Sequence, residues 1–189
     1  MFLKNMIALC KKSWKITMYH DERGGKWLTD GTVCAYLGDD CELSKEDILY
    51  VMELDDDKKE GITLTDSPMP EVFAKSINGT IEKIEKCRFT INCDGVALQP
   101  FGTLKGVLFL DTKLMQIFKD VNCKEYYFDG KMVFVRVDNR TIGMITPYRT
   151  DLDTMYNFAL NFTNLVWKAK EDHFFDSEYH QYSVLDDEQ

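Results

Sequence analysis

The spacing of apolar residues changes along the chain, and each change marks an expected helix or strand. A helix is predicted over residues 2–12, because apolar residues recur there at i, i+3, i+4 and i+7, the spacing of one helix face. These residues are Leu3, Met6, Ile7 and Cys10. Alternation then predicts strands at 14–20 and 27–37, joined by a turn that contains Gly24 and Gly25. Inside the second strand, Asp30-Gly31 predicts a turn or bulge.

A short helix is expected after these strands. Ser44 can accept a hydrogen bond from the first unpaired amides, and Asp47 takes the place of the usual Glu in a capping box. The stretch 54–61 is polar and highly charged, and 67–70 contains two prolines, which cannot donate backbone hydrogen bonds. An internal boundary is therefore expected between about residues 55 and 78.

The second half of the chain shows a similar order of elements. Strand patterns run from 80 to 101 and over 107–110. Asp111 then caps a helix predicted at 112–122, whose apolar face again follows the i, i+3, i+4, i+7 spacing. That face consists of Leu114, Ile117, Phe118 and Val121. Strands are predicted at 126–128, 132–137 and 141–146, with Asp129-Gly130 as the first turn.

The end of the chain predicts one more helix. Apolar residues fall on one face over 151–170, which indicates a long amphipathic helix, and 171–189 is a polar, acidic and frayed tail. The fold class expected is α+β, built from repeated units of a helix plus an antiparallel sheet. Residues 1–189 form either a single compact unit or two similar halves, 1–55 and 78–150, joined by a loop region.

Composition limits the cellular setting. No stretch approaches the roughly 18 apolar residues of a membrane span, and the first residues lack the order of a signal peptide. A cytoplasmic protein with no membrane contact is expected. Its six cysteines are then expected to be reduced, because structural disulfides belong mainly to exported proteins.

Charge is unevenly distributed along the chain. The formal net charge is −9, yet residues 1–20 contain no acidic residue. They contain four basic ones, Lys4, Lys11, Lys12 and Lys15. A basic helix on an acidic body is an arrangement that a functional hypothesis has to explain. A solvated surface is the simplest explanation.

Motifs for catalysis or metal binding are missing from the sequence. His20-Asp21-Glu22 is the densest cluster, but its position beside the Gly-Gly turn favours a solvated hairpin tip over a metal or acid-base site. His173 and His180 stand seven residues apart, which matches no zinc motif. We expect no metal, no cofactor and no enzymatic activity.

The repeated helix-and-hairpin pattern, with Trp27-Leu28-Thr29-Asp30-Gly31 after a basic amphipathic helix, resembles the DNA sliding clamps (processivity factors), in their small bacterial and phage forms. The resemblance implies a non-enzymatic, DNA-associated accessory protein of phage or mobile-element origin. It also implies that Lys4, Lys11, Lys12 and Lys15 face DNA. The partners expected are double-stranded DNA or a replication protein, and a second copy of the chain is a further candidate.

Two other functions remain open at this point. One is an acidic interaction or immunity-type protein that binds another protein through its acidic surface. The other is an enzyme of unrecognised type, because catalytic carboxylates can converge from distant positions without a motif.

Overall fold

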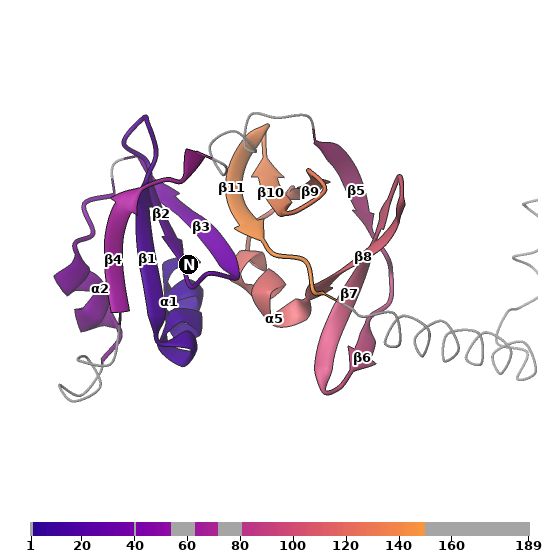
Figure 1. Cartoon of the computed structure of the whole chain (residues 1–189), viewed down its shortest axis with the longest axis horizontal. Coiled ribbons are helices and arrows are strands. Elements are labelled where there is room, and N and C mark those ends of the chain that lie inside the picture. The colour runs from indigo at the N-terminus through magenta and orange to yellow at the C-terminus, as the bar shows by residue number, and fades with distance from the viewer. Residues whose placement is uncertain (1, 40, 54–62, 72–80, 150–189) are drawn as a thin grey trace, which may run out of the picture. The chain divides into compact units, whose positions relative to one another are not determined.

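A mixed sheet of 11 strands dominates the structure, a computed structural model that describes residues 2–39, 41–53, 63–71 and 81–149 (Figure 1). The strand order is β4-β1-β2-β3-β11-β10-β9-β5-β7-β6, and β8 pairs with β7 outside this path. Strands β1 and β4 run parallel and every other pair is antiparallel. The sheet lies in one compact unit, Met1–Tyr148.

The elements have the following bounds. The strands are β1 (Lys15–His20), β2 (Lys26–Thr29), β3 (Val33–Gly38), β4 (Thr63–Pro68), β5 (Glu82–Lys86), β6 (Ile91–Cys93), β7 (Val96–Thr103), β8 (Gly106–Asp111), β9 (Glu125–Phe128), β10 (Val133–Val137) and β11 (Arg140–Ile145). The described helices are α1 (Phe2–Ser13), α2 (Lys45–Val51), α5 (Thr112–Met115) and the 3-10 helix η1 (Gln116–Phe118).

One face of the sheet carries the main core. Alternate strand residues such as Leu28, Val133 and Ile145 are buried there against apolar residues of the helices. Helices α1 and η1 also contact each other on this face, where the Asn5 side chain donates to the carbonyl of Gln116. The helices therefore share one core.

The opposite face carries a smaller apolar cluster. Its buried members are Trp27, Cys34, Met69, Phe134 and Met144. On β2 and β3 these residues alternate with residues of the main core, as the two-residue period of a strand requires. This second face holds the aromatic side chains that line the pocket described below.

Most local predictions for the strands and turns are confirmed. Ser44 and Asp47 form the predicted capping box at the start of α2. Asp30-Gly31 is a turn, so the strand predicted at 27–37 is in fact the hairpin β2–β3. The Asp30 carboxylate accepts from the backbone amides of Thr32 and Val33 and from the Thr32 hydroxyl, which explains why an acid is buried there.

The predicted α+β fold of repeated helix-plus-sheet units is wrong. The second helix, expected over 112–122, is one turn of α-helix followed by the 3-10 helix η1, whereas α1 has 12 residues. Its apolar spacing is satisfied by this short segment, because Ile117 and Phe118 already bury their side chains. The two helices lie in contact on one continuous sheet, so the described residues form a sheet-rich fold without clamp-like repeats.

The description of the chain as a clamp-like, DNA-binding, phage-related protein rested on that repeat and is corrected with it. Nothing in the part of the chain that the structure describes supports DNA binding or a phage relation. The interval 55–78, where an internal boundary is expected, is described only at 63–71, which contains β4. The helix predicted at 151–170 and the tail at 171–189 lie outside the described residues. Among the described helices, none is both long and apolar enough to cross a bilayer.

All six cysteines are free thiols, and their surroundings predict an order of reactivity. Burial raises the pKa of the Cys10 thiol to about 12 and raises that of Cys34 as well, so neither forms the reactive thiolate at neutral pH. Cys123 is exposed. We expect Ellman's reagent to modify Cys123 first in the native protein and Cys10 and Cys34 last. All six should react in denaturant without reductant; fewer would reveal a disulfide.

Candidate functional site

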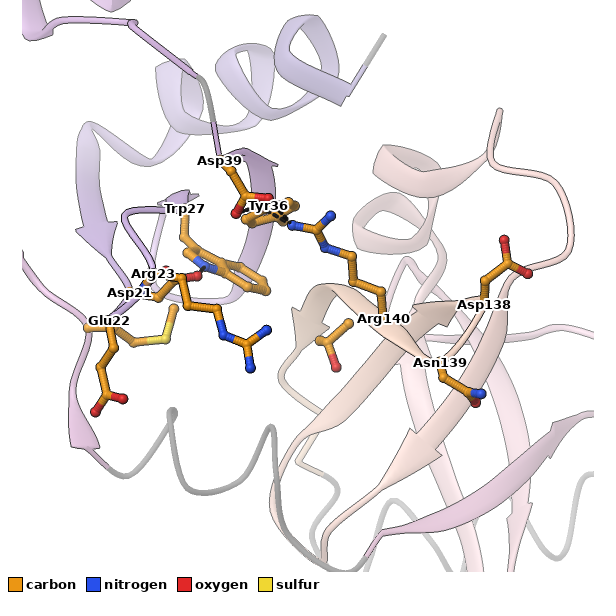
Figure 2. Close-up of a pocket in the computed structure, with 11 residues that line it drawn as sticks. Asp21, Glu22, Arg23, Trp27, Tyr36, Asp39, Asp138, Asn139 and Arg140 are labelled. Atoms are coloured by element: carbon orange, nitrogen blue, oxygen red, sulfur yellow. Dashed lines mark hydrogen bonds and ion pairs between the residues drawn. The ribbon is translucent and has the colours of Figure 1, made fainter.

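A polar pocket of about 530 Å³ opens where two hairpin turns approach each other on the sheet (Figure 2). One wall comes from the β1–β2 turn and the other from the β10–β11 turn. Strand pairing between β3 and β11 brings these walls together, although more than 100 residues separate them in sequence. The lining residues are Asp21, Glu22, Arg23, Trp27, Tyr36, Asp39, Met69, Asp138, Asn139, Arg140 and Thr141.

Asp21 organises the first wall. One carboxylate oxygen accepts from the backbone amides of Arg23 and Gly25, at 2.9 and 2.8 Å, and the other accepts from the indole N–H of Trp27 at 3.0 Å. Gly25 is needed here, because a Cβ at this position would lie 2.6 Å from the Asp21 carboxylate and 2.8 Å from the Tyr36 ring. The turn therefore fixes Trp27, which is only 3% exposed, as part of the pocket lining.

Arg140 joins the second wall to strand β3. Its guanidinium lies over the Tyr36 ring, 4.6 Å from the ring centroid, and donates to the Tyr36 hydroxyl and, at 2.6 Å, to the Asp39 carboxylate. The Tyr36 hydroxyl in turn donates to Asp39. The ring of Tyr36 also packs against Trp27, with centroids 4.9 Å apart. A guanidinium is thus held between an aromatic face and a carboxylate.

The ionisation of this group follows from its contacts. Hydrogen bonds from Tyr36 and Arg140 lower the pKa of Asp39, so its carboxylate stays charged at neutral pH. Burial, with the hydrogen bond to Asp39, raises the pKa of Tyr36 to about 12 and keeps its hydroxyl protonated. The Arg140 charge is therefore balanced inside the site by Asp39.

Three other charged residues of the pocket have no such balance. Glu22 and Asp138 are exposed, one on each wall, and neither makes an ion pair with another described residue. Arg23 extends its guanidinium toward the space between the walls (Figure 2). With four carboxylates against two guanidiniums, the lining has an excess of negative charge.

The β10–β11 turn owes its shape to Asp138 and Asn139. Both have positive φ, 49° and 64°, as the two central residues of a type I′ hairpin turn require. Asp and Asn tolerate this conformation better than most other residues. The turn places both polar side chains at the rim of the pocket (Figure 2).

The predicted site residues lie away from this pocket. Lys4, Lys11 and Lys12 are exposed on α1, and Lys15 is exposed at the start of β1. The ammonium of Lys11 donates to the carbonyl of Met52 at 2.9 Å, so it caps the end of α2. The assignment of these four lysines to nucleic acid stays a prediction.

The sequence cluster His20-Asp21-Glu22 separates into three environments. His20 pairs with Asp66 on β4, Asp21 holds its own turn and Glu22 points to solvent. No group of three or more His, Cys, Asp or Glu side chains suited to a metal ion occurs in the described residues. Sequence reasoning missed Arg140 and Asp39, because only the pairing of β3 with β11 brings them together beside Tyr36.

Comparison with known proteins gives no family assignment: no protein-family model, curated protein or solved structure matches the chain. The function is therefore inferred from the geometry and charge of the pocket.

Proposed function

We propose that this chain is a non-enzymatic binding protein that recognises a basic segment of another protein, with the polar pocket as its anchoring site. The observation that carries the proposal is the pair of unpaired carboxylates, Glu22 and Asp138, on opposite walls of a pocket with excess negative charge. The two side chains point away from each other (Figure 2), so each can pair with a different basic side chain of a segment that lies across the pocket. The net charge of −9 attracts such a partner at longer range.

The remaining lining residues suit a peptide segment. Arg23 has five N–H donors and no acceptor, so it can donate to main-chain carbonyls beside the basic side chain. Tyr36 and Met69 add apolar surface, and aromatic and Met side chains are enriched at protein interfaces. A fold alone does not indicate an activity, so the pocket carries the proposal.

Zero-length carbodiimide cross-linking in cell extract tests the proposal, because it joins a carboxylate only to a lysine amine in direct contact. We expect amide cross-links from Glu22 or Asp138 to peptides that carry a net positive charge. Changing both residues, as Glu22→Gln and Asp138→Asn, should remove these cross-links. It should also weaken binding of the identified peptide by about 1 kcal/mol, roughly fivefold, since exposed ion pairs contribute 0.2–1 kcal/mol each.

Glu85→Gln provides the matched control. Glu85 is an exposed carboxylate on β5 that does not line the pocket, so its loss should leave binding unchanged. Equal binding by the double pocket variant and the wild type, at equal thermal stability, would contradict the proposed function. Cross-links only at carboxylates outside the pocket would do the same.

A further inference from the structure

Helix α2 exposes large side chains on one side and buries apolar ones on the other. Ile48 and Met52 are buried in the core, whereas Tyr50 is 84% exposed and Val51 46% exposed. An aromatic residue this exposed contributes little to folding. We therefore ask whether its neighbours form a binding site with it.

Two exposed carboxylates lie close to Tyr50 in the chain. Glu46 lies four residues before it, and residues at this spacing are neighbours on a helical surface. Glu53 lies two residues beyond the last residue of α2, Val51, and has a positive φ of 47°. The amide of Glu53 donates to the Tyr50 carbonyl at 3.1 Å, which keeps Glu53 against the end of the helix. Both carboxylates are exposed, and neither forms an ion pair within the described ranges. We call Glu46, Tyr50 and Glu53 the α2 stripe.

The adjacent acid, Asp47, does not belong to this stripe. Its carboxylate accepts from the amide and the hydroxyl of Ser44 in the capping box, and these hydrogen bonds lower its pKa. Asp47 therefore has a structural role. This leaves Glu46 and Glu53 as the carboxylates available to a partner.

The same chain shows twice what a tyrosine beside a carboxylate binds. Arg140 lies over Tyr36, whose hydroxyl donates to Asp39. Arg136 lies over Tyr127, 5.0 Å from the ring centroid, and the Tyr127 hydroxyl donates to Glu125 at 2.9 Å. In both cases a guanidinium covers the face of a tyrosine that has a neighbouring carboxylate.

Tyr50 has the ring and the carboxylates of this arrangement, but no described arginine lies over it. We propose that the α2 stripe docks an arginine side chain of the partner protein. The guanidinium stacks on the Tyr50 ring, and Glu46 and Glu53 balance its charge. Arginine is favoured over lysine because its planar, weakly hydrated guanidinium stacks on aromatic rings and pairs with carboxylates in a bidentate manner.

This inference rests on the proposed function for the basic character of the partner, but it uses none of the pocket residues. The docking site on α2 and the pocket proposal can therefore be refuted separately. The probe is the capped peptide acetyl-Gly-Arg-Gly-amide, with its lysine counterpart as a comparison. Each peptide is titrated into the full chain, whose tyrosine rings are labelled with ¹³C, and NMR monitors the ring signals.

We expect the Tyr50 ring signals to shift with the arginine peptide and to shift less with the lysine peptide at equal concentration. Tyr50→Leu keeps every charge and should weaken binding of the arginine peptide at α2 two- to fivefold. The backbone amide signals of Glu46 and Glu53 report this binding. Tyr50→Phe keeps the aromatic face and should retain the affinity. The combined change Glu46→Gln with Glu53→Gln should weaken binding by a similar factor.

If only charge attracts the peptides to α2, the ring of Tyr50 and the shape of the guanidinium should not matter. If Tyr50→Leu leaves the affinity unchanged, or if the arginine and lysine peptides shift the Tyr50 ring equally, the proposed docking site is wrong. Absence of any Tyr50 shift overturns it as well. The Glu22→Gln, Asp138→Asn variant should leave the shift of the Tyr50 ring signals intact. If the partner protein binds this variant as tightly as the wild type, only the pocket proposal is refuted.

Discussion

Replacement of Gly143 by alanine is expected to destabilise the protein by about 3 kcal/mol, the upper end of the usual cost of overpacking a core. A Cβ at Gly143 would lie 2.1 Å from Cζ and 2.4 Å from Cε1 of Phe118, and 3.1 Å from the carbonyl oxygen of Cys34. Phe118 is fully buried and cannot move aside without disturbing η1. Chemical denaturation monitored by circular dichroism measures the change.

Gly102→Ala is the matched control for this prediction. Gly102 also lies in a strand, but nothing stands within 4 Å of its Cβ position, so the substitution should change stability by less than about 1 kcal/mol. The variant Phe118→Leu tests the mechanism, because a smaller side chain makes room for the new methyl group. In the Gly143→Ala background, Phe118→Leu should lower the free energy of unfolding by at least about 1 kcal/mol less than it does in the wild type. Strictly additive effects would contradict the direct clash.

The contact between Gly143 and Phe118 also shows why the sheet was harder to predict than its strands. Residues 112–122 and 141–146 were each assigned a local structure from their own patterns. The apolar spacing of Leu114, Ile117 and Phe118 fits the helix predicted over 112–122 and the short α5–η1 segment equally well. A spacing rule reports which side chains face the core, and the length of a helix depends on what it packs against.

The strands and turns were predictable because their signals are local. Burial alternates along β1, and the residues of β2 and β10 alternate between the two apolar clusters, as a period of two residues requires. The Asp-Gly turns need only their own residues. Pairing between β3 and β11, and the parallel pairing of β1 with β4, join segments far apart in the chain. No local pattern specifies such pairs, so the resemblance to a repeated architecture was given too much weight.

The pocket could not be found from the sequence for the same reason. Asp39 and Arg140 form an ion pair across 101 positions, and each looks like an ordinary surface charge in its own segment. Asp21 was grouped with His20 and Glu22 as a candidate cluster, whereas its real partner is the indole of Trp27. The spacing of Asp21 and Trp27 across the Gly-Gly turn is a local signal that could have indicated the first wall of the pocket.

The alanine variant of Asp21 should lose about 3 kcal/mol of stability, and it should disturb the pocket as well. The substitution removes the acceptor of two backbone amides and of the Trp27 indole N–H. Because Trp27 is only 3% exposed, water cannot easily replace the lost acceptor, and a buried unsatisfied donor costs about 1–3 kcal/mol. Denaturation curves give the stability change, and the near-ultraviolet circular dichroism of the native protein reports the packing of Trp27.

Asp129 supplies the control that isolates the indole bond. Its carboxylate caps the β9–β10 turn through the amides of Lys131 and Met132, at 2.8 and 2.7 Å, and within the described residues it accepts from no buried aromatic donor. Asp129→Ala therefore loses two comparable hydrogen bonds to backbone amides and should cost about 1–2 kcal/mol. Trp27→Phe removes the indole donor, so adding Asp21→Ala to it should cost no more than Asp129→Ala alone. If Asp21→Ala costs the same with tryptophan or phenylalanine at position 27, the indole bond contributes nothing and the carboxylate serves the turn only.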